Sequence, residues 1–282
     1  MDHKKLNARV FECMSLYLNA APRFINEQLY KKTGGDELAY SALLAAVCML
    51  DTVNDPDDKI LYRDYFIPMV HRLDPAEFES DPYYRNISFD RASLGSWELK
   101  CMTCRAYEAF VCGDPTVYPN GKILPKIGYF ERDFIYPAVL QNGREWMTLM
   151  PNETITTIPH VEKAHGRVLT FGLGLGYFAY RAALKDDVTD VTVVELDENV
   201  IKLFSDIILP QMECRDKIRV ISGDAFGFAK KNLPGDFDFV FTDIWHDPSD
   251  GVEPYLKMKE IESGCKGPEF SYWIEDTLKL YI

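Results

Sequence analysis

The 282-residue sequence has no long hydrophobic run, no excess of positive charge and no regular cysteine spacing. Its longest apolar stretch, residues 40–50, is about half the length of a membrane-spanning helix, and the N-terminus lacks the apolar core of a signal peptide. The formal net charge of −13 disfavours nucleic acid and anionic lipid as partners. The seven cysteines are odd in number and scattered, which is typical of reduced thiols. We therefore expect a cytoplasmic protein that binds neither nucleic acid nor a membrane.

A metal site is not expected either. Cys101 and Cys104 have zinc-ligand spacing, but no second pair of this kind occurs, and the spacing also suits a packed helix face. The acidic segment 51–59 lacks the glycine and the terminal glutamate of a calcium loop.

What the sequence does contain is a large apolar fraction, 47%, distributed over three zones. Residues 1–113 predict a helical N-terminal region, with Asp36 and Asp74 as helix N-caps. Within it, the spacing of Trp97, Cys101, Cys104 and Val111 predicts a packed helix over 96–113.

The second zone, residues 114–159, predicts a small β-hairpin segment. Aromatic and β-branched residues surround Asn120-Gly121 and Asn142-Gly143, the dipeptides that favour two-residue hairpin turns.

The third zone, residues 160–282, alternates strand-like and helix-like segments, which predicts a Rossmann-like α/β domain with a mostly parallel sheet. The expected strands are 167–171, 191–196, 218–222 and 237–243. Because parallel strands end at one edge of a sheet, a ligand is expected at that edge.

Three glycines, Gly172, Gly174 and Gly176, follow the first of these strands and precede a helix. Without β-carbons, such a turn lets backbone amides approach a ligand closely, although tight turning and close packing are an alternative explanation. Tyr177 stands where a dinucleotide fingerprint has its third glycine, so NAD is disfavoured.

One acidic residue lies at the carboxyl end of each of the next three strands. Glu195 can accept hydrogen bonds from two ribose hydroxyls, and Asp224 can accept one from an adenine amino group or simply cap a helix. Asp243 ends the fourth strand. Together these carboxylates predict a nucleoside site.

The segments "VLTFGLGLG", "VTVVELDENVI", "ISGDAF" and "FDFVFTD" resemble the class I S-adenosylmethionine-dependent methyltransferases over residues 160–262. The resemblance implies S-adenosyl-L-methionine as cofactor. It places the three glycines at the methionine part, Glu195 at the ribose, Asp224 with Ala225 at the adenine, and Asp243 at the catalytic edge. Thr170 stands where the family often has an acid. After residue 262 no apolar strand is recognisable and 268–282 looks helical, so the sheet is expected to be shortened at its C-terminal end.

The run from 139 to 157 and the sequence "TDIWHDP" are similar to the spermidine synthase branch of this superfamily. Asp243 and Asp247 resemble its paired acids with one extra residue between them. Leu175 replaces an acid of its glycine loop, and residues 156–158 replace its Tyr-His-Glu. The resemblance thus favours methyl transfer to a small molecule. The alternatives are a spermidine-synthase-like aminopropyltransferase and a non-catalytic nucleoside-binding protein.

The candidate catalytic residues are Asp243, His246 and Asp247. His246 has a near-neutral reference pKa suited to a base, and a hydrogen bond to a loop carbonyl is the alternative. Trp245 would stack on adenine or line the acceptor pocket, and burial against the core is the alternative. The acids around Asp247 either favour a cationic acceptor or start a helix. The shortened edge of the sheet could be covered by a second subunit in a homodimer or by the N-terminal helices.

Overall fold

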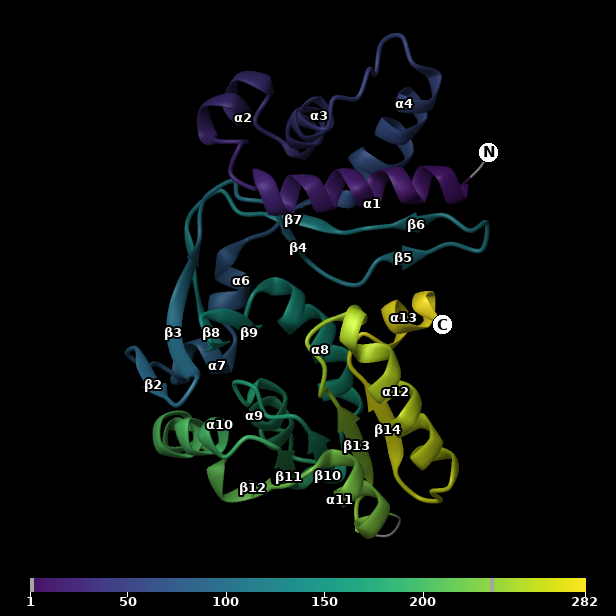
Figure 1. The fold of residues 1–282 in the computed structure, drawn as a ribbon. Coiled ribbons are helices and arrows are strands. Elements are labelled where there is room, and N and C mark those ends of the chain that lie inside the picture. Colours follow the sequence, from purple (N-terminus) through teal and green to yellow (C-terminus); the bar gives the residue numbers. More distant parts are fainter. Residues whose placement is uncertain (1–2, 234–235) are drawn as a thin grey trace. The chain divides into compact units, whose positions relative to one another are not determined.

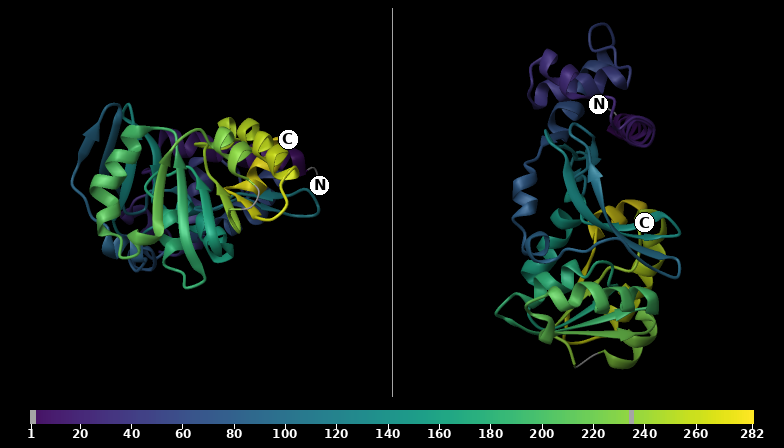
Figure 2. Two further views of the ribbon diagram at one scale, coloured as in Figure 1. Left: turned by 90° about the horizontal axis from the view of Figure 1, so that it is seen from below. Right: turned by 90° about the vertical axis from the view of Figure 1, so that its left-hand side faces the viewer.

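The computed structural model describes residues 3–233 and 236–282, and these form two compact units (Figures 1 and 2). The first unit contains the described residues up to Phe78 together with Thr103–Ile135. The second contains Glu79–Met102 and Tyr136–Ile282. The units therefore alternate along the chain, whereas the sequence predicts three consecutive regions. The boundaries predicted at 113/114 and 159/160 stay predictions.

The first unit is mostly helical, and its helix starts follow the expected capping chemistry. Asp36 accepts a hydrogen bond from the Ala39 N–H at 2.7 Å, and Asp74 accepts one from Ala76 at 2.9 Å, so both predicted caps are confirmed. The helices are α1 (His3–Ala20), α2 (Glu27–Thr33), α3 (Glu37–Val47), α4 (Pro56–Leu61), the π-helix Tyr62–Phe66, α5 (Ile67–Met69) and α6 (Pro75–Glu79), which crosses the boundary of the unit.

Short strands complete this unit. Strands β1 (Val70–Arg72), β7 (Ile127–Tyr129) and β4 (Phe110–Val111) form one sheet, and β5 (Thr116–Val117) pairs with β6 (Ile123–Leu124). The β5–β6 pair forms the predicted hairpin, but its connection has three residues, 119–121, and not two, because Tyr118 bonds to Lys122. Gly121 has a φ of +83°. Tyrosines fill the core, among them Tyr40 stacked on Tyr129 with ring centroids 3.9 Å apart.

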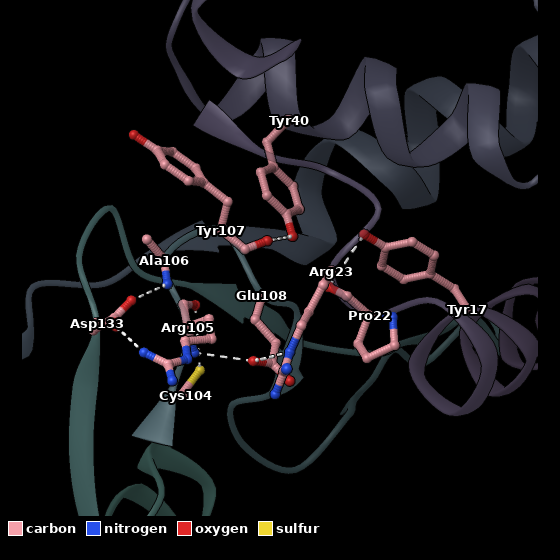
Figure 3. Close-up of polar contacts among 10 residues, drawn as sticks. All are labelled: Tyr17, Pro22, Arg23, Tyr40, Cys104, Arg105, Ala106, Tyr107, Glu108 and Asp133. Atoms are coloured by element: carbon pink, nitrogen blue, oxygen red, sulfur yellow. Dashed lines mark hydrogen bonds and ion pairs between the residues drawn. The ribbon is translucent and has the colours of Figure 1, made fainter. Parts of the chain in front are cut away.

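A strained turn at residues 105–108 is held in place from several sides (Figure 3). Tyr107 has a φ of +64°, which is unfavourable for a side chain of this size. Its carbonyl accepts a hydrogen bond from the Tyr40 hydroxyl at 2.9 Å, and Asp133 accepts one from the Ala106 N–H at 2.9 Å. These contacts offset the cost of the conformation.

The helix predicted over 96–113 is wrong. This segment forms strand β3 (Trp97–Cys104) followed by β4. The letters W-E-L-K alternate in polarity, and Trp97 and Leu99 are buried while Glu98 and Lys100 between and after them are only partly buried. A period of two places alternate residues on one face of a strand, so this pattern outweighs the helical spacing in the same segment.

Strand β3 belongs to the antiparallel sheet of the second unit, in the order β2-β3-β8-β9. The other strands are β2 (Ala92–Leu94), β8 (Phe134–Gln141) and β9 (Arg144–Thr148). β8 and β9 join at Asn142 and Gly143, which have φ angles of +52° and +79°. Two successive positive φ values match a type I′ turn, so the second predicted hairpin is confirmed.

The larger sheet of the second unit is parallel throughout, in the order β12-β11-β10-β13-β14 (Figure 1). Its strands are β10 (Gly166–Phe171), β11 (Val188–Glu195), β12 (Ile218–Ser222), β13 (Phe239–Thr242) and β14 (Glu269–Tyr272). The strand order reverses beside β10, and open α/β sheets bind ligands at the carboxyl edge of such a point. The α/β fold with a parallel sheet is as predicted.

Strand β14 corrects one expectation. The sequence predicts a helical tail, but Glu269–Tyr272 pairs with β13, and helical turns follow only from Glu275 onward. The strand has only four residues, of which two are buried, so it carries almost no periodic signal. After β14, the described part of the chain adds no further strand to this sheet.

Helices connect and flank these strands. They are α7 (Pro82–Asn86), α8 (Pro151–Lys163), α9 (Tyr177–Ala183), α10 (Glu198–Leu203), the π-helix Phe204–Ile208, α11 (Ala225–Asn232), α12 (Pro248–Ser263) and α13 (Glu275–Leu278). Three short 3₁₀ turns, Leu209–Gln211, Arg215–Lys217 and Lys279–Tyr281, complete the second unit. Within the described ranges, every helix is too short or too polar to cross a bilayer.

Candidate functional site

A cavity of about 360 Å³ lies in the second unit, where the parallel strands β10 to β13 end. This volume is within the range of small-ligand pockets, roughly 300–1,000 Å³. Six of the predicted site residues line the cavity together with His246: Gly172, Gly174, Glu195, Asp224, Ala225 and Asp243. Gly176 and Asp247 are not among its lining residues. The predicted residues therefore converge, with two exceptions.

The three glycines are required by their protein neighbours. All three have positive φ angles, +95°, +51° and +74° in chain order. A β-carbon at Gly172 would collide with the Asp243 carbonyl, one at Gly174 with the Met147 sulfur, and one at Gly176 with the Phe204 ring. Close packing accounts for each glycine, so the glycine pattern alone does not establish a ligand loop.

Four backbone N–H groups of residues 172–176 already have partners. Those of Gly172 and Gly176 donate to the Val194 and Leu173 carbonyls at 3.0 and 2.7 Å. The Leu173 N–H donates to Glu195 Oε2 at 3.1 Å, and the Leu175 N–H donates to the Met147 sulfur at 3.2 Å. Glu195 Oε1 accepts from the Asp197 N–H at 2.9 Å. Burial raises the pKa of Glu195 in spite of these hydrogen bonds. The carboxylate keeps lone pairs free for hydroxyl groups in the cavity.

Asp224 caps a helix, which is the predicted alternative to ligand binding. Its side chain caps α11 by accepting a hydrogen bond from the Gly227 N–H at 2.6 Å. It also lines the cavity beside Ala225 and Phe226. Capping uses one carboxylate oxygen, so contact with an adenine amino group stays a prediction.

Asp243 follows β13, and its N–H extends the sheet by donating to the Phe171 carbonyl at 2.9 Å. Its side chain lines the cavity, and its carboxyl accepts none of the hydrogen bonds found among the described residues. Burial raises the pKa of Asp243 to about 7. A carboxyl of this kind can take up and release a proton near neutral pH.

His246 and Asp247 are held by their surroundings. His246 Nε2 lies 3.0 Å from the Glu145 carbonyl and Nδ1 lies 3.3 Å from Asp247 Oδ2, so both ring nitrogens have partners. Asp247 caps α12, accepting from Ser249 at 2.6 Å, and forms a capping box with Asp250. The hydrogen bond from Ser249 holds the pKa of Asp247 below its usual range. The carbonyl that His246 contacts belongs to strand β9 and not to a loop, whereas the predicted helix start at Asp247 is present in the structure.

Several lining residues were missed by sequence analysis. Glu153 lies in the first turn of α8, and burial together with the charge of Asp243 raises its pKa well above the usual range. Trp273 follows the missed strand β14, and its indole N–H donates to Thr156 Oγ1 at 2.8 Å. Trp97 and Trp146 come from the antiparallel sheet, with ring centroids 5.7 Å apart. An acid near a helix N-terminus is a common favourable pattern, so Glu153 gave no distinctive signal.

Trp245 also lines the cavity and is buried, as the alternative of burial against the core predicts. Stacking on adenine and lining of an acceptor pocket stay predictions. One face of its ring packs against Gly251 of α12. Among the described residues, its indole N–H has no hydrogen-bond acceptor.

Comparison with known proteins places this site in a family context. The spermine/spermidine synthase domain matches residues 149–262. A conserved hypothetical protein of Streptococcus pyogenes is 20% identical, with a TM-score of 0.29, over 35% of this chain and 61% of that one. A probable spermidine synthase of Corynebacterium glutamicum ATCC 13032 is 19% identical, with a TM-score of 0.33, over 39% of this chain and 44% of that one.

This chain thus spans less than two thirds of either solved structure. No curated protein matches it. The matched segment begins just before α8 and runs through β10 to β13 into α12, and so includes the glycine turn and all three strand-end acids. Residues 149–262 therefore match the spermine/spermidine synthase domain, a domain of the S-adenosylmethionine-dependent transferase superfamily.

Proposed function

We propose that this protein transfers a methyl group from S-adenosyl-L-methionine to a small, cationic acceptor. One observation carries the proposal: Glu195, Asp224 and Asp243, from the ends of three parallel strands of one sheet, line a single cavity beside the glycine turn. Carboxylates at these positions suit the hydroxyl and amino groups of an adenosine.

Several lining residues fit an adenosyl group. Glu195 has free lone pairs for ribose hydroxyls, while its bonds to Leu173 and Asp197 fix its orientation. Ala225 and Phe226 provide apolar surface next to Asp224 for a base. The cofactor would supply a methyl group already activated by a sulfonium, so the protein mainly has to position the two reactants.

Asp243 is the lining group best suited to handle a proton. Burial raises its pKa to about 7, which brings its titration close to neutral pH. Deprotonating an alkylammonium with a lysine-like pKa of about 10.4 would cost roughly 4–5 kcal/mol, a small part of a catalytic barrier.

Aminopropyl transfer is the second candidate, favoured by the charge of the cavity. Among the described residues, the lining has five carboxylates, from Glu153, Glu195, Asp197, Asp224 and Asp243, and no lysine or arginine. Such a lining suits a donor that has an additional ammonium group and no carboxylate, as decarboxylated S-adenosylmethionine does. Leu175 argues against this candidate, because the glycine turn has a buried apolar side chain where the spermidine synthases have an acid.

Isothermal titration calorimetry with S-adenosylmethionine, its decarboxylated form and S-adenosylhomocysteine tests the proposal. Preference for S-adenosylmethionine, followed by mass spectrometric detection of a methylated amine, is the expected result. Preference for the decarboxylated form with an aminopropylated product would replace the proposal by the second candidate. Binding without turnover on a panel of amines would favour a nucleoside-binding protein.

A further inference from the structure

Two cysteines of the first unit, Cys13 and Cys48, lie close together although they are 35 positions apart in the sequence. Cys13 belongs to α1, and Cys48 directly follows the last residue of α3. The Cys48 sulfur lies 3.9 Å from the Cys13 carbonyl oxygen and within hydrogen-bonding reach of the Cys13 thiol. Both side chains are partly exposed at the margin of the tyrosine core. A small reagent can therefore reach two adjacent thiols.

The acidity of Cys13 differs from that of the cysteines outside this pair. Hydrogen bonding with the Cys48 thiol and the charge of Arg9 lower the pKa of Cys13 to about 7, against the opposing effect of burial. Arg9 lies about one turn before Cys13 in α1, and an ion pair with Asp58 at 2.5 Å holds its guanidinium. Burial raises the pKa of the cysteines outside the pair, which are Cys101, Cys104, Cys112, Cys214 and Cys265. Cys13 therefore has the largest thiolate fraction near neutral pH.

Cys48 is suited to the complementary role. Its hydrogen bond with Cys13 raises its pKa, and burial adds to this effect. It also lies at the C-terminal end of a helix, where the helix dipole disfavours a negative charge. A thiolate with a protonated thiol beside it is the arrangement in which one cysteine attacks a disulfide and the other resolves the product. Once the Cys13 sulfur is bound in a mixed disulfide, it is neutral, and the main cause of the raised pKa of Cys48 disappears.

We propose that Cys13 and Cys48 form a reversible redox site that reacts with low-molecular-weight disulfides, with Cys13 as the attacking thiol and Cys48 as the resolving thiol. The product is a disulfide that joins α1 to the end of α3 within the first unit. Such a bond closes the intervening chain into a loop and so restricts the unfolded state. The site does not depend on the proposed transfer reaction, whose candidate residues all lie in the second unit.

The reaction exchanges one disulfide for another. The Cys13 thiolate attacks one sulfur of the reagent, and the reagent's sulfur–sulfur bond breaks with its electron pair on the departing thiolate. Cys48 then loses its proton to water and attacks the Cys13 sulfur, which releases the second half of the reagent as a thiolate. The two cysteines are oxidised by two electrons in total. The reagent is reduced to two thiols, which take up the two protons that the cysteines lose.

The test uses oxidised glutathione as probe, added at pH 7 to the reduced full-length protein in the absence of oxygen. Intact-mass spectrometry should show the loss of two hydrogens and no retained glutathione. Peptide mapping after alkylation of the remaining thiols should find Cys13 linked to Cys48, and dithiothreitol should restore both thiols. Cys101 is exposed but has a raised pKa, so it should react about fivefold more slowly or less, because its smaller thiolate fraction outweighs its higher nucleophilicity.

Serine variants separate the two roles. Cys48→Ser keeps a hydrogen-bond donor beside Cys13 but cannot resolve a mixed disulfide, so one glutathione should accumulate on Cys13. Cys13→Ser removes the attacking thiol, so Cys48 should be modified roughly tenfold more slowly than the wild-type pair is oxidised. Cys101→Ser is the matched control, because it removes an exposed cysteine outside the pair, and it should form the disulfide at the wild-type rate. Circular dichroism of the reduced variants checks that each one is folded.

Three results would overturn the redox site. They are the modification of Cys101 before the pair reacts, a wild-type protein in which Cys13 and Cys48 stay unlinked, and a folded Cys48→Ser variant without glutathione on Cys13. If a serine variant does not fold, the first two results still decide, because they need only the wild-type protein. None of these measurements involves an S-adenosyl compound, so failure of the redox site leaves the proposed function standing, and the reverse is also true.

Discussion

Replacing Asp243 with asparagine removes a carboxyl that burial shifts towards its neutral form. The pKa of this group rises from 3.8 to about 7, a difference of roughly three units. At about 1.36 kcal/mol per unit, the ceiling of the effect is about 4 kcal/mol. The residue is only partly buried and faces a cavity that water can enter, so we expect about 1–3 kcal/mol.

The sign follows from proton linkage. A group whose pKa is higher in the folded than in the unfolded state contributes stability that is fully present below the unfolded pKa, near 4, and is lost as the pH rises through about 7. The asparagine of the variant does not titrate. Urea unfolding of the Asp243→Asn variant should therefore give nearly the wild-type free energy at pH 4 and a higher one, by the amount above, at pH 8.5.

Asp247→Asn is the control for this experiment. Asparagine caps helices about as well as aspartate, and the pKa of Asp247 is lowered, with hydrogen bonding to Ser249 as the main cause. Removing this carboxyl should not raise stability at high pH. If the unfolding free energies of the wild type and of Asp243→Asn differ by the same amount at pH 4 and at pH 8.5, then burial does not hold Asp243 neutral. The proposed role of Asp243 as a proton acceptor near neutral pH would then have no support.

Three further changes test other parts of the site. Glu195→Ala should weaken S-adenosylhomocysteine binding by about 1.5–3 kcal/mol in calorimetry, and an unchanged dissociation constant would remove Glu195 from the site. Asp224→Asn keeps the helix cap, so the melting temperature should hold while the affinity for adenosyl ligands falls, and equal affinity would leave Asp224 as a cap alone. Gly174→Ala should destabilise the protein by more than about 1 kcal/mol. The loss should be smaller in a Met147→Ala background, because the Met147 side chain that the new β-carbon would meet is then absent. Additive effects in this double-mutant cycle would contradict the packing argument.

Sequence patterns were informative where a local rule determines the structure. Asn142 and Gly143 both adopt positive φ, as their hairpin turn requires, and Asp36 caps its helix. The order of strands and helices around the glycine turn predicted a parallel sheet, and parallel connections then placed Glu195 and Asp243 at the same edge.

Tertiary context decided the rest. Trp97 to Cys104 has a helical spacing of apolar residues, but residues 97–100 also alternate in polarity, and pairing with neighbouring strands selects the strand. Strand β14 is too short for periodicity, so Trp273 could not be assigned to the cavity. Glu153 looks like an ordinary acid in the first turn of a helix until the structure places it beside Asp243.

The glycine turn and the unpartnered acids differ in what they say about function. Gly172, Gly174 and Gly176 would be needed for this turn even without a ligand, because protein atoms occupy the space of each missing β-carbon. Glu153 and Asp243 have no comparable folding reason, and burying them costs stability. Groups that weaken the fold without serving as caps or ion pairs are expected at functional sites. The acids, more than the glycines that first drew attention to this segment, therefore support a ligand site at this edge of the sheet.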